Sequence, residues 1–188
     1  MFLSSNKHFG TAPTTPKPIH RLALCMALAA PCLAAAWAQA PAASIEPVTV
    51  QVCGQPVTYT TVPQRVVTHE VGITEMFLHL GLGDKFVGYS GMGDKKLVAA
   101  EYRPWLDKAV MLSKAYMNLE TLVGSGADFM FAGWTYGFQD DALTPALLAD
   151  YGISSYVLTE SCIRKFDRKA VALQDTFDDM LNLGKIFR

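Results

Sequence analysis

The stretch "PQRVVTHEVGITEMFLHLGLGDKFVGYS", residues 63–90, contains the pattern that decides the fold class. "RVVTHE" is typical of a short strand, and apolar residues then recur over residues 73–80 with the i, i+3, i+4, i+7 spacing of an amphipathic helix. Gly81 and Gly83 follow as stop signals for the helix, and "KFVGYS" is typical of a second strand. A strand, a helix and a strand in this order indicate a unit of a parallel sheet.

The alternation of strands and helices continues along the chain. Ahead of this unit, "VTVQVCGQPVTYTTV" (residues 48–62) alternates apolar and polar residues around Gly54, which predicts a β-hairpin. After the unit we expect a helix near residues 95–102 that Pro104 breaks, a helix at Asn118, the strand "DFMFAG", a helix near residues 142–151 and the strand "SSYVL". This order predicts an α/β fold: a single Rossmann-like lobe with a central, mostly parallel sheet flanked by helices.

The last segment, residues 166–188, predicts one long helix of about twenty residues with Asp167 as its N-cap. No glycine or proline stop signal follows Phe187, so we expect this segment to be the truncated start of a longer helix. Its apolar residues fall on one face, which we expect to be the buried one: Ala170, Leu173, Phe177, Met180, Leu181 and Phe187.

Residues 1–38 have the pattern of a secretory signal peptide. Their only charges are Lys7, Lys17 and Arg21, and the apolar run "LALCMALAAPCLAAAWA" follows and ends in an A-x-A cleavage site. The alternative is an uncleaved anchor, for which this run is short and is interrupted by Pro31. Residues 39–47 are then a linker, and residues 48–165 form the lobe. We expect export to the periplasm.

The chain after residue 38 is about 150 residues long, enough for one domain with a real core. It has 17 acidic and 13 basic residues, a formal charge of −4, without the basic stripe that marks nucleic-acid binding. Cys53 and Cys162 are its only cysteines, in a compartment that permits disulfides. We expect them to form a bridge; the alternative is two separate buried thiols.

Several stretches together resemble one family, the periplasmic substrate-binding proteins of ABC importers for iron-siderophores and vitamin B12. Residues 63–90 resemble the family's Pro-x-Arg-Val-Val start, its threonine-glutamate pair and its Leu-Gly-x-Gly-Asp-x-x-Val-Gly motif. "MNLETLVGSGADFMFAGW" (residues 117–134) resembles its Asn/Ser-Leu-Glu helix and the strand that follows. "DDMLNLGKIFR" (residues 178–188) resembles the start of the long helix between the two lobes.

This resemblance implies a non-enzymatic receptor with two α/β lobes, of which this chain has the N-terminal one and lacks the second. It implies a ligand held in the cleft between the lobes, a ferric siderophore or related chelate, with haem or cobalamin as alternatives. It also implies an inner-membrane ABC permease as partner, no cofactor beyond the ligand, no nucleic acid, and a monomer when complete.

Ligands of open parallel sheets bind beyond the carboxyl ends of the strands. The residues at those ends, and in one loop that resembles a ligand-facing loop of the family, are the candidate ligand-binding residues: His69, Glu70, Tyr89, Ser90, Lys114, Tyr116, Trp134 and Tyr136. Four of them (His69, Tyr89, Tyr116 and Tyr136) are candidate axial ligands if the ligand is haem. The ordinary alternative for each aromatic residue is a place at the rim of the core.

His69 and Glu70 together have two further interpretations. They suit a metal ion directly, but His79 lies too far along the next helix to share one, so we expect contact with a chelated metal and no bare metal site. They could instead be the base pair of an exported hydrolase, although no G-x-S-x-G, H-E-x-x-H or C-x-x-C nucleophile or metal motif occurs.

Glu120 lies in the first turn of the helix that begins after Asn118. A carboxylate there is favoured by the helix dipole, which is sufficient local reason for its presence. In the family that the chain resembles, a glutamate at this motif docks onto arginines of the permease, so the resemblance implies the same role for Glu120.

Overall fold

The structure is a computed structural model that describes residues 46–94 and 97–188. The predicted signal peptide and nearly all of the predicted linker therefore lie outside the described residues. Within the described part of the chain, no helix has both the length and the apolar character needed to cross a membrane.

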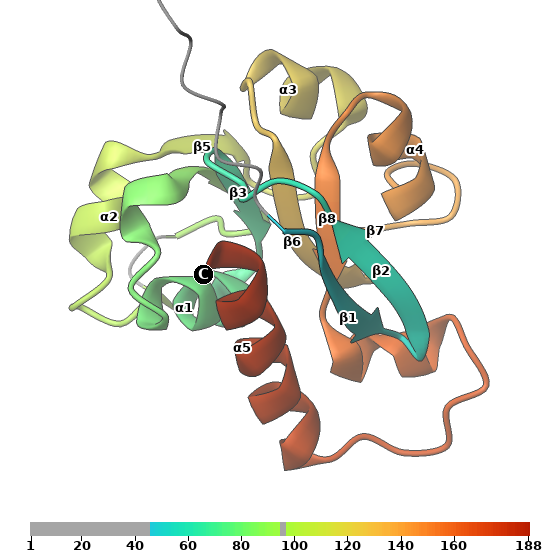
Figure 1. Ribbon diagram of the computed structural model, residues 1–188. Coiled ribbons are helices and arrows are strands. Elements are labelled where there is room, and N and C mark those ends of the chain that lie inside the picture. Colours follow the sequence, from blue (N-terminus) through green and yellow to red (C-terminus); the bar gives the residue numbers. More distant parts are fainter. Residues whose placement is uncertain (1–45, 95–96) are drawn as a thin grey trace, which may run out of the picture. The chain divides into compact units, whose positions relative to one another are not determined.

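A six-stranded parallel sheet forms the centre of the lobe, as the sequence predicts (Figure 1). The strands follow the order β5-β4-β3-β6, and β6 pairs on its other side with β8 and at its end with the short β7. Their bounds are β3 (Val66–His69), β4 (Phe86–Ser90), β5 (Val110–Ser113), β6 (Phe129–Trp134), β7 (Gly137–Phe138) and β8 (Ser154–Val157).

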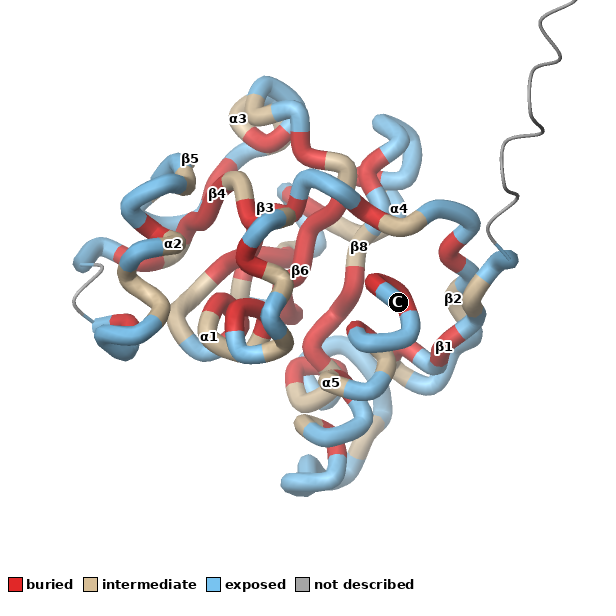
Figure 2. Tube along the Cα trace, turned by 60° about the vertical axis from the view of Figure 1, so that its left-hand side comes forward, coloured by how far each residue is buried: buried red, intermediate tan, exposed pale blue. Residues whose placement is uncertain are grey.

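The central strands are buried along their whole length, which is typical of a parallel sheet covered on both faces. Every residue of β3 and β6 is buried, and Figure 2 shows β6 in red. Phe131 of β6 packs edge-on against Tyr156 of β8, and Phe129 packs edge-on against Phe187 of the last helix. The sheet therefore has little conformational freedom, and the positions of its strand ends are well defined.

The predicted β-hairpin is present as β1 (Val48–Val52) and β2 (Gln55–Tyr59), paired antiparallel. Its two-residue turn is Cys53-Gly54, and both residues have positive φ, 49° and 78°. Two positive φ angles are what a type I′ turn requires, and this turn type matches the twist of the two strands. The hairpin therefore holds Cys53 at its tip.

The helices are α1 (Val71–His79), α2 (Arg103–Lys108), α3 (Leu119–Gly124), α4 (Pro145–Asp150) and α5 (Leu173–Phe187), with the 3-10 helices η1 (Gly83–Lys85) and η3 (Thr159–Arg164). Asn118 caps α3 as predicted, because its side chain accepts a hydrogen bond from the Thr121 amide at 2.8 Å. Gly81 follows α1 with φ 75°, the left-handed conformation common after a helix.

The predicted position of the helix near residues 95–102 is wrong. Residues 95–96 lie outside the described residues, and the helix of this segment is α2, which begins at Arg103. Pro104 lies in its first turn instead of breaking it. Proline is tolerated there because the first amide groups of a helix have no partner within the helix.

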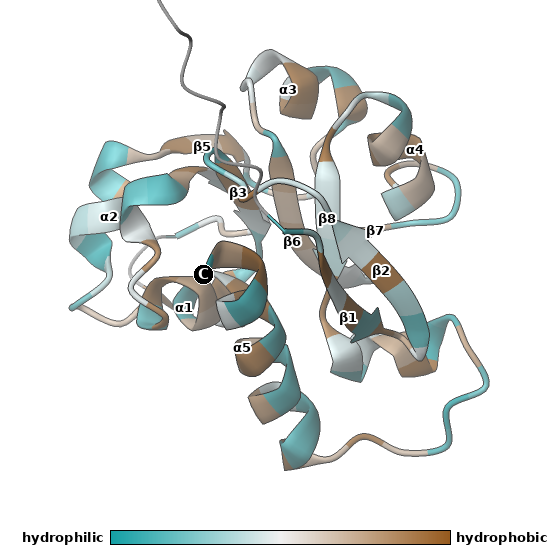
Figure 3. Cartoon of the chain, viewed as in Figure 1, coloured by the Kyte–Doolittle hydropathy of each residue, from teal (hydrophilic) through white to brown (hydrophobic). Residues whose placement is uncertain are grey.

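The C-terminal helix is present, but two predictions about it are wrong. Helix α5 is 15 residues long and begins after Ala172, so Asp167 is not its N-cap. Its buried face consists of Asp175, Asp179, Leu183, Ile186 and Phe187. Most of the expected apolar face is exposed instead: Leu173 to 72 %, Phe177 to 51 % and Leu181 to 62 %. Figure 3 shows brown and teal residues side by side around this helix.

Candidate functional site

The connections of the sheet create a switch in direction between β3 and β6. From β3 the chain moves outward to β4 and then β5, and it returns to the other side of β3 to form β6 and then β8. The loops that leave β3 and β6 therefore diverge, and in open α/β sheets the crevice between such loops is where ligands bind.

A pocket of about 490 Å³ lies at this point, which we call the switch-point pocket. It is lined by residues that follow β3, β6 and β8, together with the start of α1 and the start of α5. The polar side chains in its lining are Glu70, Tyr136, Glu160 and Thr176, and apolar side chains such as Ile73, Met76 and Leu158 make up most of the remainder.

Glu70 has an unusual backbone conformation, with φ 77° and ψ 157°. This region is nearly restricted to glycine and costs about 1 to 3 kcal/mol for another residue. The surroundings hold it in place: its amide donates to the Ser90 carbonyl at 2.9 Å, and its carbonyl accepts from the Thr74 amide and hydroxyl. Its carboxylate caps α1 by accepting from the Gly72 amide at 3.0 Å. The carboxylate is therefore fixed at the rim of the pocket.

Tyr136 and Glu160 lie on the opposite side of the switch point from Glu70. The Tyr136 ring is half-buried, and the Arg164 guanidinium lies 4.9 Å from its centre and donates to its hydroxyl. Glu160 is half-buried in η3 and makes no hydrogen bond or ion pair within the described ranges. Sequence reasoning missed Glu160, because a first-turn carboxylate in a short 3-10 helix carries no pattern that points to a pocket.

His69 and Ser90 lie beneath the strand ends and not on their surface. His69 Nδ1 and Ser90 Oγ are 2.8 Å apart, and both side chains are buried. Burial lowers the pKa of His69 from 6.5 to about 4, so the imidazole is neutral at pH 7. The two residues therefore support the strand ends, and neither of them lines the switch-point pocket.

Two glycines allow the chain to approach His69 closely. A Cβ atom at Gly91 would lie 2.6 Å from the imidazole ring, and one at Gly137 would lie 2.9 Å from the His69 Cβ. Both glycines also have positive φ. The imidazole is thus enclosed by backbone on two sides, which explains why these strand-end loops are glycine-rich.

Tyr116 and Lys114 lie in the loop after β5, as predicted, and both are exposed. The Tyr116 ring stacks over His69 with 5.1 Å between the ring centres, and its hydroxyl donates to the Thr135 carbonyl at 2.5 Å. Tyr116 therefore links the β5 loop to the turn after β6. Neither residue lines the switch-point pocket itself.

Two of the predicted ligand-facing aromatic residues lie elsewhere. Tyr89 is 5 % exposed and stacks against Phe86 inside the core. Trp134 is 8 % exposed and lines a different, apolar pocket of about 250 Å³ beside the hairpin tip and α4. Its indole Nε1 is buried without a hydrogen-bond partner among the described residues. Both residues fit the alternative of core and rim packing.

The predicted disulfide is present between Cys53 and Cys162, whose Cα atoms are 5.4 Å apart. It joins the tip of the hairpin to η3, the element that carries Glu160. By closing a loop of this length, with a sequence separation of 109, it restricts the unfolded chain strongly. Within the described residues the hairpin makes no strand pairing with the main sheet, so the disulfide links it covalently to the lobe.

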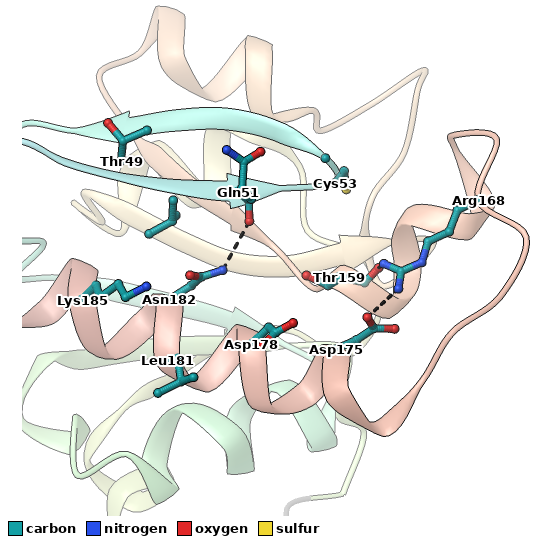
Figure 4. A pocket seen from close by; sticks show the side chains of 12 residues that line it. Thr49, Gln51, Cys53, Thr159, Arg168, Asp175, Asp178, Leu181, Asn182 and Lys185 are labelled. Atoms are coloured by element: carbon teal, nitrogen blue, oxygen red, sulfur yellow. Dashed lines mark hydrogen bonds and ion pairs between the residues drawn. The ribbon is translucent and has the colours of Figure 1, made fainter.

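A second pocket of about 490 Å³ lies between the hairpin and α5 (Figure 4). In its lining Arg168 forms an ion pair with Asp175, and the Asn182 amide group donates to the Gln51 carbonyl. These contacts join α5 to the preceding loop and to β1. Thr159, from the start of η3, also lines this pocket, but none of the predicted ligand-binding residues does.

Asp179 is a buried carboxyl group that sequence reasoning did not single out. It is 1 % exposed and accepts hydrogen bonds from the Tyr156 hydroxyl at 2.7 Å and from the amide and hydroxyl of Thr159. Burial raises its pKa from 3.8 to about 6. This carboxyl group holds α5 to β8 and to the start of η3.

Glu120 is exposed on α3, in the first turn, as the sequence predicts.

The geometry for a His69 and Glu70 base pair is poor, because the imidazole bonds to Ser90 whereas the Glu70 carboxylate caps α1. Among the described residues, no three histidine, cysteine or acidic side chains come close enough together to hold a metal ion.

Comparison with solved structures identifies what this lobe is similar to. A periplasmic binding protein from Veillonella parvula matches with 31 % sequence identity and a TM-score of 0.62, over 75 % of this chain and 45 % of that one. The chain is similar to one half of a periplasmic binding protein. No protein-family model and no curated protein matches its sequence.

Two further solved structures have the same fold. The ABC-type Fe3+-hydroxamate transport system from Saccharomonospora viridis matches with 20 % identity and a TM-score of 0.56, over 74 % of this chain and 50 % of that one. The heme binding protein HmuT matches with 14 % identity and a TM-score of 0.51, over 78 % and 43 %. The chain thus spans about half the length of these proteins, and the predicted fold and resemblance are confirmed.

Proposed function

We propose that this chain is the N-terminal lobe of an exported substrate-binding protein, which captures a ferric siderophore or a related chelate for an ABC importer. The observation that carries the proposal is the switch-point pocket, which lies at the ligand-binding position of this class of sheet in a lobe similar to a periplasmic binding protein. By name, the proteins with the same fold include an ABC-type Fe3+-hydroxamate transport system and a heme binding protein.

In this proposal the lobe supplies one wall of the ligand site. The pocket volume of about 490 Å³ falls within the usual range for small-molecule sites. The Tyr136 ring and the apolar side chains of Ile73 and Leu158 provide apolar contact, and the fixed Glu70 carboxylate orients the ligand. A chelate bound here would be half covered, and a second lobe would enclose the other half.

The exposed apolar residues of α5 support a second lobe. Leu173, Phe177 and Leu181 follow each other at a spacing of four residues and are all more than half exposed. A contiguous apolar surface of this kind on a helix marks contact with further protein. We therefore propose that this side of α5 packs against the second lobe, which is also the role of the inter-lobe helix that the sequence resembles.

Glu120 is proposed as the contact to the permease. It is exposed on a short helix whose first turn is fixed by the Asn118 cap, so its position is well defined. An acidic side chain in a fixed position suits a charge-assisted contact with an arginine. In cells that carry the complete importer, Glu120→Ala should reduce uptake while the affinity for the chelate in solution stays the same. Loss of affinity would place Glu120 in the ligand site instead.

Haem stays a second candidate ligand, since Tyr116 and Tyr136 both lie near the strand ends. Their hydroxyls are already engaged, one with the Thr135 carbonyl and the other with Arg164. Either would have to exchange its hydrogen bond for iron. A haem titration would show this exchange as a shift of the Soret band that Tyr136→Phe or Tyr116→Phe removes.

Calorimetric titration of the full chain with ferrichrome, a ferric enterobactin-type catecholate, cobalamin and haem tests the general proposal. We expect binding of at least one of them, and Tyr136→Ala should weaken it on the order of tenfold by removing the aromatic contact. Tyr151→Ala is the matched control, since Tyr151 is 55 % exposed and lies outside the pocket. If none of the four ligands binds, or if both variants behave alike, the proposal is wrong.

A further inference from the structure

The charges of the switch-point pocket are all of one sign among the residues that line it. Glu70 and Glu160 enter from opposite sides of the switch point, one after β3 and the other after β8. None of the described residues in the lining is a lysine, an arginine or a histidine. Glu160 has no partner within the described ranges, and Glu70 is bonded only to an uncharged backbone amide. Neither carboxylate is therefore neutralised by an ion pair.

The basic side chains of the neighbouring loops are directed to other partners. Arg164 lies over the Tyr136 ring and donates to its hydroxyl, outside the pocket lining. Lys165, directly after the end of η3, pairs with Asp140 and lies 5.1 Å from the centre of the Trp134 ring. The arrangement leaves the pocket acidic although η3 itself has a basic end.

Arg168 and Lys114, two further basic residues, do not line the switch-point pocket either. Arg168 forms its ion pair with Asp175, in the pocket between the hairpin and α5. Lys114 is exposed in the loop after β5 and does not line the switch-point pocket. No lysine, arginine or histidine among the described residues lines this pocket, and Arg164 reaches its edge only through the Tyr136 hydroxyl.

We infer that the switch-point pocket selects a chelate that presents a cationic group to this lobe, such as a ferric hydroxamate with a free ammonium, and rejects polyanionic ferric catecholates. This inference rests on the proposed function and narrows its substrate class. A catecholate complex carries several negative charges, which two unpaired carboxylates repel. An ammonium group between Glu70 and Glu160 is instead attracted by both and can donate hydrogen bonds to them.

The fixed position of Glu70 strengthens the selection. Its backbone is held by hydrogen bonds to Ser90 and Thr74, and its carboxylate is held by the Gly72 amide. Moving this carboxylate away to make room for an anion would break its hydrogen bond to the Gly72 amide. In a water-like dielectric, a unit charge about 4 Å from a carboxylate changes affinity roughly fivefold, so two carboxylates give roughly 25-fold.

The experiment compares ferrioxamine B, whose ferric hydroxamate carries a free ammonium group, with its N-acetylated form, which has the same chelate but no such charge. Both are titrated into the full chain by calorimetry, and ferric enterobactin serves as the polyanion. We expect ferrioxamine B to bind roughly 10- to 30-fold more tightly than its acetylated form, and the catecholate more weakly than both. Glu160→Gln should reduce the first ratio roughly fivefold.

Glu120→Gln is the matched control, because it removes the same charge from an exposed helix outside the pocket and should leave the ratio unchanged. Equal affinities for ferrioxamine B and its acetylated form, or tighter binding of the catecholate, would overturn the charge selection but leave the proposed function standing. A chain that binds none of the chelates, cobalamin or haem refutes the proposed function and the inference with it.

Discussion

Replacing Asp179 with asparagine should change how the stability of the lobe depends on pH. The carboxyl group is 1 % exposed, and burial raises its pKa from 3.8 to about 6. In the folded protein it therefore keeps its proton up to pH about 6, whereas in the unfolded chain it loses the proton near pH 4. Folding binds a proton in this window, so this contribution to stability is full below pH 4 and is lost as the pH rises to about 6.

The size of the effect follows from the two pKa values. Each pH unit between them corresponds to about 1.4 kcal/mol, so the Asp179 contribution changes by roughly 3 kcal/mol between pH 4 and 6. His69 acts in the opposite direction, because burial lowers its pKa from 6.5 to about 4. Its contribution is full above pH 6.5 and is lost as the pH falls to 4, again by roughly 3 kcal/mol.

The two windows overlap, so in the wild-type protein these two contributions largely cancel. Asp179→Asn removes one of them, and the variant should lose roughly 3 kcal/mol of unfolding free energy between pH 6.5 and 4 through His69 alone. Urea unfolding followed by circular dichroism at pH 4, 5, 6 and 7 measures both curves. The informative quantity is the difference between wild type and variant at each pH, because contributions from all other groups drop out of it.

Asp178→Asn is the control, since this neighbouring carboxylate is exposed and, among the described residues, bonds only to the Gln174 amide group. We expect its curve to run parallel to that of the wild type. A difference between wild type and Asp179→Asn that stays constant from pH 4 to 7 would refute the reasoning. It would mean that Asp179 is ionised in the folded lobe despite its burial.

Three further predictions concern the packing. Gly91→Ala should lower the unfolding free energy by roughly 2 to 4 kcal/mol, because residue 91 has a positive φ and the new Cβ would collide with the His69 ring. Gly93 has open space around it, so Gly93→Ala should change the unfolding free energy by less than about 0.5 kcal/mol. Leu183 is buried and Leu181 is exposed on the same helix, so Leu183→Ala should lower the unfolding free energy by about 2 to 5 kcal/mol and Leu181→Ala by less than about 0.5 kcal/mol. Similar losses for the two variants would contradict the orientation of α5. Reduction of the disulfide should lower the unfolding free energy by roughly 2 to 5 kcal/mol and loosen the hairpin, which hydrogen exchange of its amides would show; unchanged stability would contradict its role.

The strand and helix pattern of the chain was predictable because local periodicity reports it directly. The hairpin turn at Gly54, the stop at Gly81 and the cap at Asn118 each have a local physical cause, and the structure has all three. The orientation of α5 had no such local cause. Apolar spacing favoured the face with Phe177 and Leu181, but the face with Asp179 is the buried one because Tyr156 and Thr159 bond its carboxylate.

The candidate site was predictable in part. The rule that ligands bind beyond the strand ends led to Glu70 and Tyr136, and both line the switch-point pocket. The same rule could not tell which way a side chain at a strand end points, so Tyr89 and Trp134 were included although they are buried elsewhere. Glu160 was missed because it lies in η3, three residues after the end of β8, and the end of β8 was not among the strand ends from which the candidates were taken.

The sequence by itself determined the fold class, the resemblance to a periplasmic receptor, the disulfide partners and the region of the site, since these depend on composition, periodicity and motifs. Only the tertiary structure decided which side of α5 is buried and which strand-end residues share a pocket. It also decided that the pocket has two unpaired carboxylates and no basic group among its described lining residues. The physical reason is that burial and pairing depend on contacts between segments far apart in the chain. Glu70 and Glu160, ninety residues apart, line one pocket because β3, β6 and β8 are neighbours in the sheet.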